Sequence, residues 1–404
     1  MFELTGKYGT AKVYASTVED ECVSQIYGFM NSPVVEGCNI AIMPDTHAGK
    51  GSCIGFTQKI NGRVNPNMVG VDIGCGMLVL KITKEAGDII FNKPGLDKFD
   101  KIMHTKIPFG MDHRKTLHKF AKEIDITKLI ANADYSKEMF ALGSLGGGNH
   151  FVEIDKDDAG DYYIVIHSGS RHLGIAVAKY WEDKAVEYHK NNSKAKNDLI
   201  NKLKKEGREK DIQTELAKIP TIVVSKELSY LEGEDLNGYI HDMEIAQEFA
   251  RLNREAMLDV LITEMGIKKR HIIEKWCTIH NYIDIKNGIL RKGAISLQDG
   301  ETAIIPINMQ FGSLIVKGKG NPDWNYSGPH GAGRLMSRSK AKETLKMEDF
   351  KNAMKDIYTT SVCVSTIDEA PMAYKSADEI LDNIKENAEV INIIKPIYNF
   401  KAAE

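Results

Sequence analysis

The sequence predicts an α+β fold, with a β-sheet core, flanking helices and a helical insertion. Short apolar runs cut by glycine occupy residues 37–82 and return at residues 271–320, which is typical of strands joined by tight turns. Between these blocks, residues 174–265 place apolar side chains three and four apart among charged stretches, which is the period of a helix. Neither strand-rich block holds a complete set of partners. We therefore expect one domain over residues 1–404, interrupted by the helical segment.

The remaining segments complete the predicted order of elements. Residues 1–36 predict a short strand followed by a helix, and residues 84–140 predict a mixed region that is helical in places. The β-branched and aromatic residues at 161–167 (DYYIVIH) predict a strand. The tail at 339–395 predicts two helices separated by a loop at Pro371, because proline cannot continue a helix.

The composition limits the class of protein. Hydrophobic residues make up 42 % and charged residues 27 % of the 404 residues, as in ordinary soluble globular chains. No run approaches the roughly 18 apolar residues of a membrane span, and the N-terminal residues lack the pattern of a secretion signal. The six cysteines are too scattered for a disulfide framework. We therefore expect a cytoplasmic protein with reduced thiols and no membrane association.

The charge balance bears on nucleic-acid binding. The chain carries 53 Lys and Arg against 56 Asp and Glu, a net charge of −3, which excludes a protein that coats polyanions through its whole surface. Residues 190–210 hold a local excess of basic side chains, which favours a solvated helical face. Any role in binding nucleic acid must therefore rest on a local site.

Several histidines occupy an unusual setting beside short polar turns. They are His47, His150, His167, His280 and His330, and all except His280 have a glycine within three residues. Asp72 and Cys75 lie three apart in VGVDIGCGM, at the end of an apparent strand. Because the ends of strands in one sheet can meet, we expect these side chains to form one polar cluster. The donor set suits a borderline transition metal, with zinc ranked first and manganese, iron or cobalt next.

Two glycine-rich loops favour phosphate binding. The segments LGSLGGGNH and HGAGR offer backbone N–H groups that can surround an anion, although neither fits the Walker A or the GxGxxG pattern. Arginines accompany these loops at Arg171, Arg334 and Arg338. Together with the metal cluster, they indicate that the site handles a phosphate group.

The motifs taken together resemble the RtcB family of RNA ligases. The matching series runs in order from about residue 40 to Lys401: MPDTHAGKG, VGVDIGCGM, GGGNHF, IHSGSR, HN, RKGA, HGAGRLMSR and EAPMAYK. The resemblance implies a single RtcB-like catalytic domain that joins an RNA 3′-phosphate or 2′,3′-cyclic phosphate end to a 5′-hydroxyl end. It also implies GTP and two Mn²⁺ ions as cofactors, a role in tRNA splicing or RNA repair, and an archease-type activator as a possible partner.

The resemblance also assigns roles to single residues. It gives Asp72, Cys75, His150, His167 and His280 as ligands of the two ions. Cys75 would bridge both ions, with His167 and His280 on one and Asp72 and His150 on the other. His330 would be the nucleophile that takes GMP, since a neutral imidazole can attack phosphorus, and Arg171 would bind the RNA phosphate. The matching motifs also hold His47, Arg291 and Lys292, to which the resemblance gives no definite role.

A guanylate pocket follows from the same resemblance. Its residues are Asn149, Phe151, Glu153, Pro306, Asn308, Ser313, Ala332, Tyr374 and Lys401. Glu153 would select guanine, because a carboxylate can accept hydrogen bonds from both N1–H and the N2 amine. The family commonly has PGSMG in the nucleotide loop, whereas this chain has Ile307 and Gln310 at the glycine positions. We expect these side chains to stiffen the loop and add bulk near the phosphates.

Two other functions remain open at this point. A metal-dependent phosphoesterase acting on cyclic phosphates of RNA would need the metal cluster but not His330, Glu153 or Lys401. A non-catalytic RNA-binding protein would not need a full set of metal ligands. Covalent labelling by GTP would separate the ligase from both.

Overall fold

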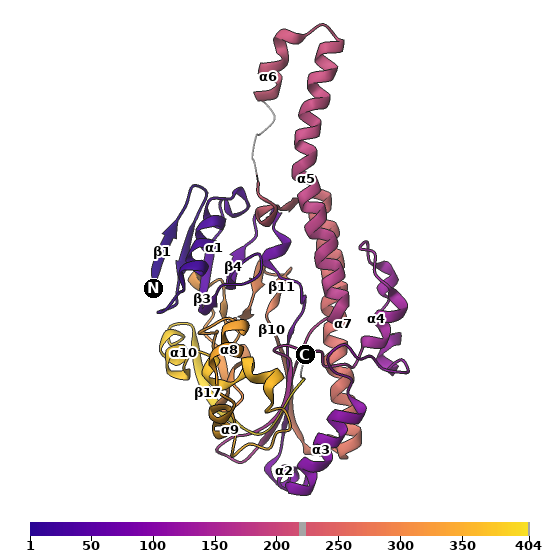
Figure 1. Ribbon diagram of the computed structural model, residues 1–404, viewed down its shortest axis with the longest axis vertical. Coiled ribbons are helices and arrows are strands. Elements are labelled where there is room, and N and C mark those ends of the chain that lie inside the picture. Colours follow the sequence, from indigo (N-terminus) through magenta and orange to yellow (C-terminus); the bar gives the residue numbers. More distant parts are fainter. Residues whose placement is uncertain (218–223, 403–404) are drawn as a thin grey trace.

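The computed structural model describes residues 1–217 and 224–402. It confirms the α+β class: the strands form two main sheets, and long helices run along one side of them (Figure 1). No helix in the described part of the chain is long and apolar enough to cross a membrane.

The first sheet has six strands in the order β1-β2-β3-β4-β12-β11. Their bounds are β1 (Phe2–Thr5), β2 (Thr10–Val13), β3 (Ile40–His47), β4 (Ile54–Lys59), β12 (Ile289–Lys292) and β11 (Asn281–Asp284). Only β2 and β3 pair in parallel. The predicted N-terminal strand is in fact the hairpin β1–β2, and the predicted helix after it is α1 (Asp20–Met30), whose Phe29 packs against Phe56 of β4.

The second sheet has seven strands, all antiparallel, in the order β10-β6-β8-β7-β17-β15-β14. Their bounds are β10 (Ile272–Ile279), β6 (Gly76–Ile82), β8 (Tyr162–Ser168), β7 (Phe151–Lys156), β17 (Ala388–Lys401), β15 (Gly312–Gly318) and β14 (Thr302–Asn308). Every residue of β8 is buried, which explains its continuous run of β-branched and aromatic residues. Two short pairs complete the strands: β5 (Arg63–Val64) with β9 (Leu231–Glu232), and β13 (Ala294–Ser296) with β16 (Ser327–Pro329).

The register of the second sheet gathers the chemically active residues at one end. Gly76, directly after Cys75, pairs with Ser168 on one side and with Ile279 on the other. His167 pairs with Phe151, so the residues just before β7 and at the end of β8 lie at the same edge. Because alternate strands run in opposite directions, the start of two strands and the end of two others meet there.

The helical segment predicted at 174–265 corresponds to two long helices and short elements between them. These are α5 (Arg171–Lys205), α6 (Ile212–Ala217) and α7 (Gly233–Met265); residues 218–223 of that segment lie outside the described part. Side chains of α7 contribute to both main cores, including Phe249 in one and Leu261 in the other. In Figure 1, α7 runs along the body while the far end of α5 extends beyond it. The earlier mixed region contains α2 (Lys84–Ile90), α3 (Lys93–Lys106) and α4 (Tyr135–Ala141).

The prediction for the C-terminal tail was wrong in two respects. The tail holds three short helices instead of two: α8 (Arg338–Thr344), α9 (Met347–Ala353) and α10 (Ala377–Asn383). It then forms the 14-residue strand β17 in the middle of the second sheet. Pro396 argues against a central strand because it has no N–H to donate. The sheet accommodates it through an irregularity in register between Pro396 and Tyr398.

Candidate active site

Five predicted metal ligands form one cluster, in which all but the half-buried Asp72 are buried. Two groups, Cys75–His167–His280 and Asp72–Cys75–His150, each keep their ligand atoms within 4.8 Å of one another, and they share the Cys75 sulfur. The Cys75 Sγ lies 3.3 Å from His167 Nε2 and 3.4 Å from His150 Nε2. Two three-ligand sites joined by one sulfur are the arrangement that a pair of metal ions would need.

Two of the imidazoles, those of His150 and His167, are held in the form that binds a metal. His150 Nδ1–H donates to the Leu145 carbonyl at 2.9 Å, and His167 Nδ1–H donates to the Asn149 carbonyl at 3.1 Å. Since a carbonyl can only accept, each Nε2 is left with its lone pair free for an ion. Burial lowers the pKa of His167 and of His280 well below its usual value, so both rings are neutral. Burial also raises the pKa of Cys75, so a thiolate there needs a cation beside it. The residues therefore fit a pair of divalent ions.

Helix α7 fixes the strand ends that carry these ligands. The buried Arg254 Nη1 donates to the Gly74 carbonyl at 2.8 Å and to the Ser168 carbonyl at 2.7 Å, next to Cys75 and His167. The neighbouring Asn253 binds the backbone of Ser144 and Gly169 through its side-chain amide. These bonds hold the ends of β6 and β8 in register at the point where the hydrogen bonds between the two strands stop.

His330 follows β16 and meets Asp45 of β3. Its Nδ1–H donates to Asp45 Oδ2 at 2.7 Å, and the same oxygen accepts the backbone N–H groups of His330 at 3.0 Å and Gly331 at 3.2 Å. The His330 ring lies 4.8 Å from the His280 ring, measured between centroids. His330 Nε2 is thus the free nitrogen beside the metal cluster. The sequence analysis missed Asp45, whose only signal was its place two residues before His47 in MPDTH.

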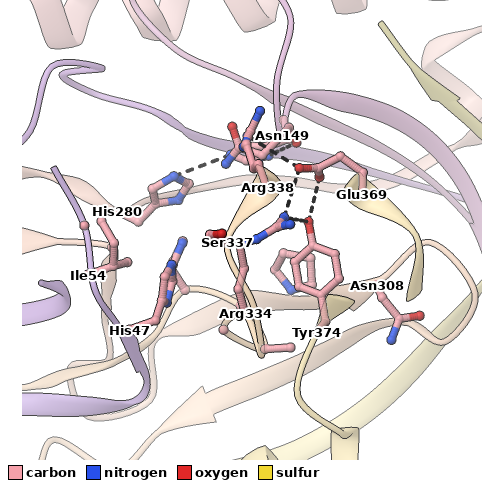
Figure 2. A pocket seen from close by; sticks show the side chains of 18 of the residues that line it. His47, Ile54, Asn149, His280, Asn308, Arg334, Ser337, Arg338, Glu369 and Tyr374 are labelled. Atoms are coloured by element: carbon pink, nitrogen blue, oxygen red, sulfur yellow. Dashed lines mark hydrogen bonds and ion pairs between the residues drawn. The ribbon is translucent and has the colours of Figure 1, made fainter. Parts of the chain in front are cut away.

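A cavity of about 760 Å³ opens over His330. Figure 2 shows His47 and His280 on one side of it and Asn308 and Tyr374 on the other. The predicted residues that line it are Asp72, Cys75, Asn149, Phe151, Glu153, His167, His280, Pro306, Asn308, His330, Ala332, Tyr374 and Lys401. His150, Arg171 and Ser313 lie outside its lining. One cavity therefore joins most of the metal ligands, the imidazole and most of the predicted guanylate pocket.

Comparison with known proteins shows which family the chain resembles. The family model described as tRNA-splicing ligase RtcB matches residues 25–133 and 121–402. The RNA-splicing ligase RtcB of Escherichia coli (strain K12) is 33 % identical over 393 residues, covering 89 % of each chain, and RtcB1 of another Escherichia coli strain gives the same figures. The tRNA-splicing ligase RtcB of Aeropyrum pernix is 26 % identical, covering 84 % of this chain and 82 % of its own.

The chain belongs to the RtcB family. It is therefore an enzyme of the ligase class, and the cavity over His330 is its candidate active site.

At the end of this RtcB cavity that holds the predicted guanylate pocket (the guanylate end), Glu153 is a buried carboxyl. Burial raises its pKa to about 7, although the Asn399 amide, which donates to Glu153 Oε1 at 2.5 Å, and the charge of Lys401 both lower it. The group is therefore about half ionised near neutral pH. Ligand N–H groups beside it would favour the charged form.

Glu369 also lines this cavity and organises its polar side chains, and the sequence analysis did not single it out. It accepts from the Tyr374 hydroxyl at 2.6 Å and from Arg334 at 3.2 Å, and it forms an ion pair with Lys401. Arg338 adds a fourth contact at 3.4 Å. Two predicted pocket residues, Tyr374 and Lys401, are thus placed by one carboxylate in the EAPMAYK motif.

The nucleotide loop that departs from the RtcB pattern is the turn between β14 and β15. Asn308 Oδ1 accepts from the backbone N–H of Gln310 at 3.0 Å and of Phe311 at 2.9 Å, so its side chain closes the turn. Ile307 lines the cavity but packs into a hydrophobic core with only 2 % of its surface exposed. Gln310 is exposed and does not line the cavity, so the expected bulk near the phosphates does not come from its side chain.

Arg171 begins α5 in a strained conformation. Its φ of 57° lies in the left-handed region, which is uncommon for a residue with a side chain. The guanidinium donates to Ser144 Oγ at 3.2 Å and to the Gly110 carbonyl at 2.6 Å. It packs over Gly146, where an added Cβ would lie 1.8 Å from Arg171 Nη1. The same added Cβ would lie 2.8 Å from His150 Nδ1, so the guanidinium lies near the predicted metal ligands.

Proposed function

We propose that this RtcB family enzyme is a GTP- and Mn²⁺-dependent RNA ligase. It joins an RNA 3′-phosphate or 2′,3′-cyclic phosphate end to a 5′-hydroxyl end through a guanylylated histidine. The carrying observation is the free Nε2 of His330, held by Asp45 beside two metal-binding triads that share Cys75. Neither a simple phosphoesterase nor an RNA-binding protein requires a nucleophile in that place. Tests on intact tRNA exons and on broken tRNA or rRNA would separate splicing from repair.

In the first step, His330 Nε2 attacks the α-phosphorus of GTP, and pyrophosphate leaves. The new bond is N–P and the broken bond is P–O. Asp45 keeps the proton on Nδ1 and stabilises the positive charge that develops on the ring. Two Mn²⁺ ions on the shared-cysteine triads would supply Lewis acidity that neutralises charge on the phosphates.

Two walls of the cavity select the base. Glu153 accepts from guanine N1–H and the N2 amine, which adenine does not offer on the same edge. Lys401, held in place by Glu369, adds a positive charge to the same end of the cavity. Replacing the acceptor by an apolar group would leave buried donors unpaired, which costs about 1–3 kcal/mol for each group.

In the later steps, the 3′-phosphate of RNA attacks the guanylylated His330 and takes GMP. The 5′-hydroxyl then attacks that phosphate and releases GMP. A 2′,3′-cyclic phosphate is first opened by water. Arg171, which lies beside His150, binds the RNA phosphate. We also propose that the enzyme works in the cytoplasm and accepts an archease-type activator.

Incubation with α-labelled GTP and Mn²⁺ tests the proposal directly. We expect a covalent guanylate that is acid-labile, as a phosphoramidate should be. His330→Ala should abolish the label and keep its metal content, because His330 is outside both triads. The matched control is His241→Ala, an exposed histidine bonded to the Lys128 carbonyl. Hydrolysis of cyclic phosphates without any covalent guanylate would instead establish the phosphoesterase.

A further inference from the structure

A second imidazole is fixed beside the nucleophile by the same residue. His47, at the end of β3, donates its Nδ1–H to the main-chain carbonyl of Asp45 at 2.9 Å. The carboxylate of Asp45 meanwhile holds His330 Nδ1–H at 2.7 Å. Because both acceptors are occupied by Nδ1–H, both histidines keep an unprotonated Nε2. One aspartate therefore sets the tautomer of two rings.

The imidazole of His47 can accept a proton from a ligand in the cavity. His47 lines the cavity, and its Nε2 makes no hydrogen bond within the described residues. The charged and titratable groups that act on it are His330, Asp45 and Arg334. Glu19, Glu21 and Lys50 line the same cavity. Burial lowers the pKa of His47, so the ring is neutral at pH 7. It is not a member of either metal-binding triad.

His47 also lies on the side of the cavity from which the last nucleophile must come. Figure 2 places it across the pocket from Tyr374 and Asn308, which belong to the guanylate end. In phosphoryl transfer the attacking and leaving oxygens are roughly in line through phosphorus. With the departing guanylate at the Tyr374 end, the incoming hydroxyl approaches from the opposite end.

We infer that His47 is the general base of the sealing step and takes the proton of the incoming RNA 5′-hydroxyl. This inference rests on the proposed ligase function. The O5′–H proton passes to His47 Nε2 while O5′ bonds to the 3′-phosphorus. The bond between that phosphorus and the guanylate oxygen breaks, and GMP leaves with its electron pair. The imidazolium then returns its proton to solvent, so no other reactant is needed.

A simpler role for His47 is to support Asp45. In that case a change at His47 would disturb His330 and slow guanylylation as much as sealing. A general base for the hydroxyl acts only when the hydroxyl reacts. The two roles therefore differ in which step slows.

The test compares the steps in the full-length protein loaded with Mn²⁺. The variants are His47→Gln, which keeps a polar side chain, and His47→Ala, with His241→Gln as the control. Guanylylation is followed with labelled GTP. Sealing is followed in a single turnover from an RNA prepared with a 3′-guanylate, which bypasses His330.

We expect sealing to fall by about 10²–10⁴-fold in both variants, the usual contribution of a general base, while guanylylation stays within about threefold. Added imidazole should restore part of the sealing rate in His47→Ala. Sealing within twofold of the unmodified protein would overturn the inference, and so would an equal loss in both steps. Failure of the unmodified protein to label with GTP would count against the ligase proposal, while the prepared RNA still tests His47.

Discussion

The two ends of the cavity over His330 are built in different ways. At the metal end, the ligands sit at strand ends, and main-chain carbonyls fix the rings of His150 and His167. At the guanylate end, the polar side chains bind one another, as Glu369 does with Tyr374 and Lys401. The first end is fixed by the fold before any ligand arrives. In the proposed function, the second would exchange these internal partners for a nucleotide.

The largest effect is expected from Asp45→Asn at the rigid end. Removing the charge while keeping the shape should lower the guanylylation rate by about 10⁴-fold, the size seen where a buried carboxylate orients a catalytic imidazole. Metal content should not change, because Asp45 belongs to neither triad. Initial rates of labelling with GTP give the measurement. A loss under tenfold would mean that His330 does not depend on this bond.

The next effect concerns the shared sulfur. Cys75→Ala removes a ligand from both triads, whereas His280→Ala removes one from a single triad. We expect metal analysis to show a clearly greater loss of Mn²⁺ in Cys75→Ala. Cys38→Ala, a free cysteine outside both triads, is the control. Small and equal losses in both variants would show that Cys75 is only a buried apolar side chain.

At the adaptable end, binding of the base should depend on pH. With the pKa of Glu153 raised to about 7, only its ionised form accepts from guanine, so affinity should rise as pH increases. Between pH 6 and 8 the ionised fraction grows about tenfold, and the affinity for guanosine should follow it. Guanosine is the suitable probe because it has no phosphate that titrates. Calorimetry should give a flat profile for Glu153→Gln; a flat profile for the unmodified protein would refute the role.

The smallest effect is expected from Gln310→Gly in the nucleotide loop. Gln310 is exposed and outside the cavity, so GTP use should change less than about twofold on the scale of ordinary surface substitutions. Ile307→Ala should differ, since it removes a buried side chain and should lower the free energy of unfolding by about 2–5 kcal/mol. Steady-state kinetics measure GTP use in Gln310→Gly, and denaturant unfolding measures the stability of Ile307→Ala. A large gain in GTP use from Gln310→Gly would restore the expectation drawn from the sequence.

The difference between the two ends of the cavity also explains which parts of the site the sequence could predict. The metal cluster was predictable because its members stand at strand ends, and all of them except His280 stand near glycines. Antiparallel register brings such ends together. Asp45, in strand β3, and Glu369, at the end of a short helical turn, were not found, because a single acidic residue carries no local sign of the ring or ammonium group that it will meet. Strand β17 was missed because Pro396 argues against a strand in the middle of a sheet. This strand carries Lys401 into the cavity.

Helix α7 determines when, during synthesis of the chain, the metal-binding site can form. The strand ends around Cys75 and His167 are tied together by Arg254, which is synthesised almost 180 residues after Cys75, and His280 follows later still. A growing chain that has emerged only as far as α5 holds four of the five predicted ligands but neither the clamp nor the fifth. Stable capture of metal should therefore come late in synthesis, so that bound metal reports a chain that has finished folding.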